Sequence, residues 1–158
     1  MNALVTKATV AQEYLEASEY GALYGWQFSP INESGLLFTV LLVSPVDQER
    51  YELEFRFDDY PEKPYLIEFL HSPSGQRGTQ ACYPKGADHF FHPNAAICHP
   101  CSRKAYVGYA GLHGDWNMAG WQKIAGGMTN LRFILDGIYS RIIDKTLYHG
   151  RMAKPLGQ

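Results

Sequence analysis

Alternation of apolar and charged residues is the clearest pattern in the first half of the chain. Between Glu49 and Asp58 every second residue is aromatic or aliphatic, and the residues in between are charged. The apolar set is Tyr51, Leu53, Phe55 and Phe57, and the charged set is Glu52, Glu54, Arg56 and Asp58. Because successive side chains of a strand point to opposite faces, this period of two predicts a half-buried strand.

Three further strands are predicted around it. The apolar segments 26–31 and 36–43 flank the turn-forming run Asn32-Glu33-Ser34-Gly35, which together predict an antiparallel hairpin. After a turn bracketed by Pro61 and Pro64, residues 65–70 predict a fourth strand. Residues 71–85 and 106–120 are rich in glycine and polar residues, so we expect two long loops, the second packed over residues 89–101.

Helical spacing occurs at both ends of the chain. Thr9 and Gln12 have the spacing of a capping box, and the helix that follows is expected to end at Gly21. The strongest helical signal starts at Met128 and continues through apolar residues three and four positions apart to Ile142. The order helix, four-stranded antiparallel meander, irregular segment and long second helix predicts an α+β fold in a single domain over residues 1–158.

Composition and charge narrow the class of partner. The chain has 158 residues, of which 46% are hydrophobic, which suits one globular domain with a sizeable core. A formal net charge of -2 provides no global basic field for nucleic acid or an anionic membrane, so the expected partner is a protein. Three cysteines, an odd number, and the lack of a signal-peptide-like or membrane-spanning apolar run predict a cytoplasmic location.

Residues 89–101 concentrate the groups that carry chemistry. This segment holds two of the three cysteines, three of the six histidines and Asn94. A thiol can act as a nucleophile, an imidazole can help to deprotonate it, and an amide can donate to an oxyanion. The segment therefore predicts covalent chemistry on a cysteine.

Two other chemistries stay open for the same residues. His89 with His92, and Cys98 with Cys101, are two pairs with the spacing of zinc ligands, which predicts a zinc-stabilised interaction domain as an alternative. Cys98-His99-Pro100-Cys101 also has the spacing of a thiol-disulfide exchange site. It is the weaker alternative, because no apolar helix face follows it.

Four motifs occur in an order that resembles the ubiquitin-conjugating enzymes. They are Tyr60-Pro61-x-x-Pro64, His92-Pro93-Asn94, Ile97-Cys98 and a tryptophan, Trp121, shortly before a long helix, and the resemblance covers residues 9–143. The resemblance implies the ubiquitin-conjugating-enzyme-like fold and a transferase that works without a cofactor. It would accept an activated ubiquitin-like protein as a cysteine thioester and transfer it to an amine or another nucleophile. The implied partners are the ubiquitin-like protein, its activating enzyme and a target protein.

Roles for individual residues follow from this resemblance. Cys98 would be the nucleophile, Asn94 either the oxyanion donor or only a turn residue, and His92 a support of the loop backbone. Only three residues separate Asn94 from Cys98, fewer than in the family, so an alignment by spacing would favour Cys101 instead. The apolar Ile97 favours Cys98. This departure suggests a divergent, compact member, of the kind expected in a bacterial ubiquitin-like conjugation system.

No catalytic role is expected for the remaining polar residues of this region. His99 and His113 are expected to lie on the surface or to brace loops rather than to catalyse. Arg103 and Lys104 are expected to be solvated, since two adjacent basic residues on a loop are usually exposed to water.

Overall fold

The structure is a computed structural model that describes residues 2–158, and it begins with a long helix, α1 (Ala3–Ala22). The side chain of Asn2 caps this helix by accepting the N–H of Leu4 at 2.8 Å. The predicted start at Thr9 is therefore wrong, because a capping residue lies seven positions earlier. The predicted end at Gly21 is close. A Cβ there would lie 2.3 Å from Cε3 of Trp26, so the chain passes closely at this point.

A meander of five antiparallel strands follows α1, in the order β1-β2-β3-β4-β5. The strands are β1 (Gln27–Phe28), β2 (Leu37–Val43), β3 (Arg50–Arg56), β4 (Leu66–His71) and β5 (Gln76–Arg77). The first four confirm the predicted strands apart from their ends. The fifth corrects the expectation of a loop over residues 71–85, because residues 76–77 pair with the end of β4.

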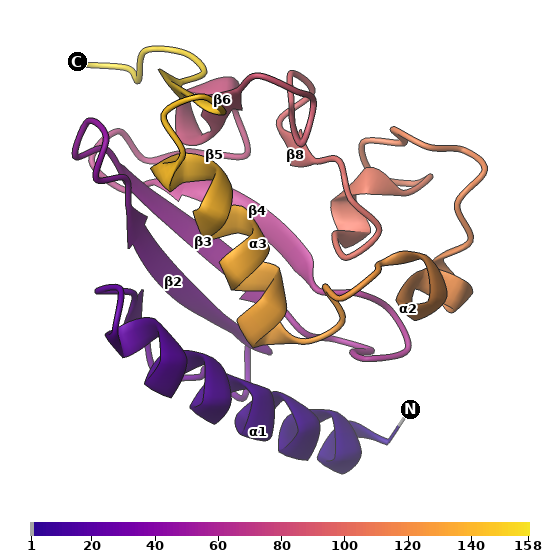
Figure 1. Ribbon diagram of the computed structural model, residues 1–158. Coiled ribbons are helices and arrows are strands. Elements are labelled where there is room, and N and C mark those ends of the chain that lie inside the picture. Colours follow the sequence, from indigo (N-terminus) through magenta and orange to yellow (C-terminus); the bar gives the residue numbers. More distant parts are fainter. Residues whose placement is uncertain (1) are drawn as a thin grey trace.

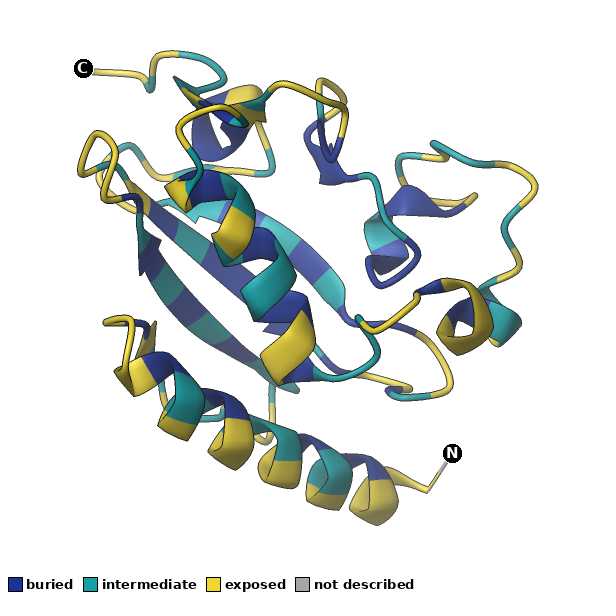
Figure 2. Ribbon diagram, in the orientation of Figure 1, coloured by how far each residue is buried: buried dark blue, intermediate teal, exposed yellow. Residues whose placement is uncertain are grey.

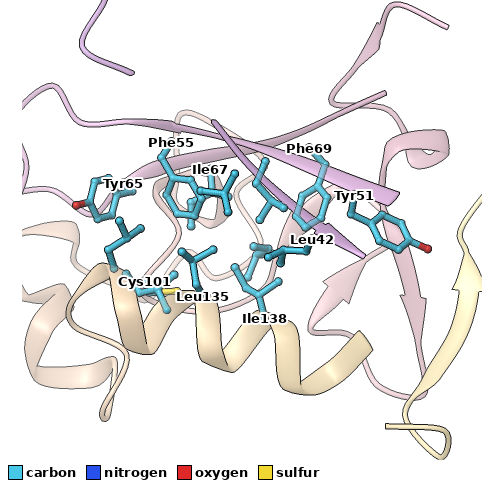
Figure 3. Packing of buried hydrophobic residues seen from close by; sticks show 14 of the residues in the cluster. Leu42, Tyr51, Phe55, Tyr65, Ile67, Phe69, Cys101, Leu135 and Ile138 are labelled. Atoms are coloured by element: carbon cyan, nitrogen blue, oxygen red, sulfur yellow. The ribbon is translucent and has the colours of Figure 1, made fainter. Parts of the chain in front are cut away.

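Helix α3 (Leu131–Ile143) packs across the sheet, as Figure 1 shows. Its first turn is capped by Asn130, whose side chain accepts the N–H of Phe133. The inward residues of the sheet and the apolar face of α3 form the core, seen in Figure 3. Buried and less buried positions alternate along β2, as in Figure 2. The confirmed architecture is α+β, with an N-terminal helix, an antiparallel sheet and a later helix.

Short elements occupy the segments between β5 and the C-terminus. They are η1 (Gln80–Cys82), β6 (Pro84–Gly86), β7 (Phe91–His92), β8 (Ala96–Ile97), η2 (Arg103–Ala105), η3 (Met118–Gly120), α2 (Trp121–Ile124) and β9 (Tyr148–Arg151). Strand β6 pairs with β9, and β7 pairs with β8. Strands of two to four residues are too short to show a period, so the sequence did not predict them. Residues 106–120, all of which the structure describes, contain no strand, as the sequence predicts.

Arg103 corrects the expectation of a solvated basic pair. Its side chain is only 2% exposed, and Nη1 lies 2.8 Å from a carboxylate oxygen of Asp58. Nε donates to the carbonyl of Pro64 at 2.9 Å. The guanidinium therefore ties η2 to the turn between β3 and β4, where its planar donors match fixed acceptors. Lys104 is partly exposed and pairs with Glu68 at 3.5 Å.

A second polar cluster joins both helices to the same turn. The carboxylate of Glu13, on α1, accepts the hydroxyl of Tyr60 at 2.7 Å and the hydroxyl of Tyr65 at 3.2 Å. It also accepts the N–H of Leu131 at 2.9 Å, which is the first residue of α3. Nearby, the indole of fully buried Trp121 donates to the carbonyl of Pro61. The turn that carries the Tyr-Pro-x-x-Pro motif is thus fixed from three sides.

Candidate active site

The His-Pro-Asn tripeptide is the turn of the β7–β8 hairpin. The N–H of Ala95 donates to the carbonyl of His92 at 2.9 Å, which closes a four-residue turn. Ala95 has a φ of 57°, in the left-handed region that lets such a turn return to the paired strand. Past the other end of the hairpin, the N–H of Cys98 donates to the carbonyl of Phe90 at 2.7 Å. Cys98 therefore lies at the base of the hairpin and Asn94 at its tip.

Burial distinguishes Cys98 from the other two cysteines. All three are free thiols, but Cys82 and Cys101 are fully buried, whereas Cys98 is half-buried. Burial raises the pKa of Cys101 to about 12. Figure 3 shows this residue among the core side chains between the sheet and α3. A nucleophile must meet its substrate as a thiolate, so the structure favours Cys98 over Cys101.

His113 is the side chain that contacts the Cys98 thiol. Its Nε2 lies 3.2 Å from Sγ. The imidazole stacks on the indole of Trp116, with ring centroids 3.9 Å apart and planes 11° from parallel. A hydrogen bond from the N–H of Leu112 to the carbonyl of Ala105 holds this loop against η2. The expectation that residues 106–120 pack over the cysteine segment is confirmed, since His113 contacts Cys98 and the hydroxyl of Tyr106 donates to the carbonyl of Pro100.

The electrostatics keep Cys98 protonated at neutral pH. Burial raises the pKa of this thiol, and the negative charge of Asp88 raises it further. A protonated Sγ–H can donate to Nε2 of His113 in the tautomer that carries its proton on Nδ1. The imidazole lies within reach of the thiol proton, so this arrangement could generate a thiolate by proton transfer.

His92 and Asn94 belong to the turn rather than to the thiol. The N–H of Asn94 donates to Nδ1 of His92 at 3.0 Å, which is the contact expected of a histidine that supports the loop backbone. Burial lowers the pKa of His92, and nearby His89 and His113 lower it further. Asn94 is exposed at the tip of the hairpin, beyond the paired residues His92 and Ala96, whereas Cys98 follows the strand at its base. The structure does not bring this amide to the thiol.

His99 is a bracing residue, as expected. Its Nδ1 accepts the N–H of Cys101 at 3.1 Å. Burial lowers its pKa to about 4, with the charge of Arg141 lowering it further, so the ring is neutral and can act as this acceptor.

The residues of the zinc alternative are not assembled into a metal site. The His89 and His92 rings lie beside each other, 5.4 Å apart between centroids. Cys98 is directed to His113, however, and Cys101 is buried in the core. Between residues 2 and 158 no three His, Cys, Asp or Glu side chains are placed to hold a metal ion.

The positions of the two cysteines also do not suit thiol-disulfide exchange. A redox pair needs two thiols that a substrate can reach, and Cys101 is fully buried in the core. Neither a group of metal ligands nor an accessible pair of thiols is therefore assembled among the described residues.

A groove of ≈ 650 Å³ lies beside Trp116. Pro100, Trp116 and Ile124 line it, together with the polar residues Asp115, Asn117 and Lys123. Because Trp116 also stacks on His113, one wall of the groove is continuous with the site. Its surface is more apolar than polar, which suits an extended peptide segment.

Comparisons with protein-family models, with curated proteins and with solved structures gave no match for this chain. Among residues 2–158 there is no helix of the length and apolar character needed to cross a membrane.

Proposed function

We propose that the protein is a transferase that carries a ubiquitin-like protein as a thioester on Cys98 and passes it to a nucleophile. The observation that carries the proposal is the 3.2 Å contact between Sγ of the half-buried Cys98 and Nε2 of His113. The order of elements supports it, since α1, the meander, the cysteine segment and α3 follow one another as in the ubiquitin-conjugating enzymes that the motifs resemble.

Loading is an exchange of thioesters. The Cys98 thiol transfers its proton to His113 as Sγ attacks the thioester carbonyl of the activated ubiquitin-like protein. The tetrahedral intermediate collapses with loss of the thiol of the activating enzyme, which takes up the proton. One C–S bond forms and one breaks, so no cofactor is required.

In the discharge step the sulfur of Cys98 is the leaving group, whereas in loading it is the nucleophile. An amine of the target protein attacks the carbonyl, the C–S bond breaks, and Cys98 regains its proton. In this proposal His92 and Asn94 shape the hairpin that presents Cys98, and the exposed Asn94 amide is a candidate oxyanion donor only if the hairpin tip approaches the bound acyl group. The apolar groove beside Trp116 would receive the C-terminal tail of the ubiquitin-like protein. Three free thiols suit a reduced, cytoplasmic setting.

The test is formation of the thioester. The protein is mixed with its ubiquitin-like protein, the activating enzyme and ATP, and adducts are separated with and without reductant. We expect a reductant-sensitive adduct on the wild type, a reductant-resistant ester on Cys98→Ser, and none on Cys98→Ala. Cys101→Ala, a matched removal of a buried thiol, should still load. Loading of Cys98→Ala together with loss in Cys101→Ala would transfer the proposal to Cys101.

A further inference from the structure

A thioester on Cys98 would lie next to a base. Nε2 of His113 is 3.2 Å from Sγ, and the acyl carbon would be bonded directly to that sulfur. An oxygen or nitrogen atom that attacks this carbon therefore comes within hydrogen-bonding reach of Nε2, directly or through one water molecule. Trp116 holds the imidazole plane by stacking, so the base does not depend on the acyl group for its orientation.

Amines and hydroxyls need such a base to different degrees. A lysine amine, with an ordinary pKa of about 10.4, has a neutral fraction that attacks unaided and loses its proton afterwards. Water, with a pKa of about 15.7, stays fully protonated at neutral pH, and aliphatic hydroxyls behave similarly. Such oxygen nucleophiles become effective when a base removes the proton as they attack. A fixed imidazole beside the acyl carbon is therefore most useful to a hydroxyl acceptor.

We propose that the protein transfers the acyl group of Cys98 to hydroxyl acceptors, namely serine or threonine side chains, with His113 as general base. This inference rests on the proposed function, since it names the acceptor of the same thioester. Lysine would remain a competing acceptor, and water a slower one.

The step balances without any further reactant. The acceptor oxygen bonds to the acyl carbon while its proton moves to Nε2 of His113. The tetrahedral intermediate then loses Sγ as the C–S bond breaks, and the imidazolium returns the proton to the sulfur. The products are an oxygen ester and the free Cys98 thiol.

The surroundings of the sulfur favour this proton return. Burial and Asp88 raise the pKa of Cys98, which makes an unprotonated thiolate a poorer leaving group. A proton supplied by the imidazolium as the C–S bond breaks removes that disadvantage. The same imidazole thus acts on both the entering oxygen and the leaving sulfur.

The test uses a small acyl group, so that it does not depend on the ubiquitin-like protein. The purified protein is acetylated on Cys98 with p-nitrophenyl acetate, freed of reagent, and mixed with N-acetylserinamide or N-acetyl-lysinamide. Intact mass spectrometry follows deacylation, and product analysis separates the ester from the amide. The variant is His113→Gln, which keeps a polar side chain but no base. The matched control is His89→Gln, an exposed histidine near the hairpin.

We expect wild-type protein to form the serine ester, at a rate that rises with pH along a single ionisation. His113→Gln should slow discharge to the hydroxyl about a hundredfold and lose that ionisation. Discharge to the amine should fall less than tenfold, and His89→Gln should match the wild type. Wild-type protein that yields only the lysine amide, or equal losses for both acceptors in His113→Gln, would overturn this inference while leaving thioester formation intact. Failure to load the ubiquitin-like protein, with serine transfer retained, would instead count against the proposed function alone.

Discussion

The imidazole of His113 meets the thiol of Cys98 with 3.2 Å between Nε2 and Sγ, although the two residues belong to segments with no shared helix or strand. The thiol lies directly after the hairpin β7–β8, and the imidazole lies on the glycine-containing loop after η2. This pairing joins a nucleophile to a base, which is the minimum arrangement for acyl transfer through a covalent intermediate. In the proposed reaction the imidazole would take the proton of a thiol whose pKa is raised.

The first prediction concerns the reactivity of the cysteines. In native protein iodoacetamide should modify Cys98 and spare Cys82 and Cys101, because these two are fully buried. The raised pKa of Cys98 lowers its thiolate fraction, so at pH 7.5 its alkylation should be slower than that of free N-acetylcysteine. Peptide mass mapping identifies the modified residue and gives the rate.

Asp88→Asn tests how much the charge of Asp88 contributes to the reactivity of Cys98. Burial is the larger cause of the raised pKa of Cys98, and the charge of Asp88 is the second. Oδ1 of Asp88 also accepts the N–H of Phe90, a hydrogen bond that asparagine can keep. Alkylation should become about two- to fivefold faster, and the difference should shrink in high salt. A rate unchanged at low salt would mean that burial alone sets the reactivity of the thiol.

The second prediction separates the two roles considered for Asn94. A turn residue at the hairpin tip contributes little to discharge, so Asn94→Ala should change single-turnover transfer to free lysine less than about threefold. An oxyanion donor would cost about a hundredfold, with loading nearly unchanged. Loading and discharge are measured separately on the same preparations. A hundredfold slower discharge would show that the hairpin tip reaches the acyl group during transfer.

The third prediction concerns zinc. Protein purified without added metal should contain no stoichiometric zinc, because Cys98 is paired with His113 and Cys101 is buried away from the histidines. Elemental analysis measures the content directly. Stoichiometric zinc that disappears in His89→Ala or Cys101→Ala would restore the metal interpretation.

Long periodic segments were the predictable part of this fold. Apolar and charged residues alternate over the seven residues of strand β3, and apolar residues recur along α3 as far as Ile142. Each pattern therefore indicates which face of its element is buried. The two-residue strands β5, β7 and β8 lack this information. Their pairing depends on turns and neighbours rather than on a period.

The site was predictable only in part, for a similar reason. Dense cysteines and histidines identified the segment that holds Cys98, but the contact with His113 spans 15 positions and is set by the path of an irregular loop. A histidine three residues before a tryptophan in a loop expected to cover the segment was the available signal. Arg103 was misjudged because the sequence carries no mark of the acceptors that surround a buried charge.

The fourth prediction tests that buried arginine against its neighbour. Arg103→Lys cannot satisfy both Asp58 and the carbonyl of Pro64, so it should destabilise the protein by ~3 kcal/mol. Lys104→Gln removes a partly exposed pair with Glu68 and should cost less than ~1 kcal/mol. Urea unfolding followed by tryptophan fluorescence compares the two variants. Equal losses would mean that the fixed geometry around Arg103 contributes nothing beyond its charge.

The fifth prediction concerns Glu13, whose carboxylate links α1, Tyr60 and α3. Burial raises the pKa of Glu13 above its usual value of 4.5, although the hydrogen bonds from Tyr60, Leu131 and Tyr65 oppose this shift. The folded protein then binds a proton at this group more tightly than the unfolded chain does. Its contribution to stability is therefore fully present below pH 4.5 and decreases as the pH rises through the raised pKa.

Glu13→Gln removes this titration while keeping an oxygen that can accept the N–H of Leu131. The unfolding free energy of the wild type minus that of Glu13→Gln should therefore fall between pH 4.5 and pH 7.5, and it should be level below that range. Denaturant unfolding at matched pH values measures the difference, and Glu19→Gln, at an exposed position further along α1 and not among the groups that shift the pKa of Glu13, is the control. A difference that rises with pH would mean that the hydrogen bonds outweigh burial and that the pKa of Glu13 is lowered in the folded protein.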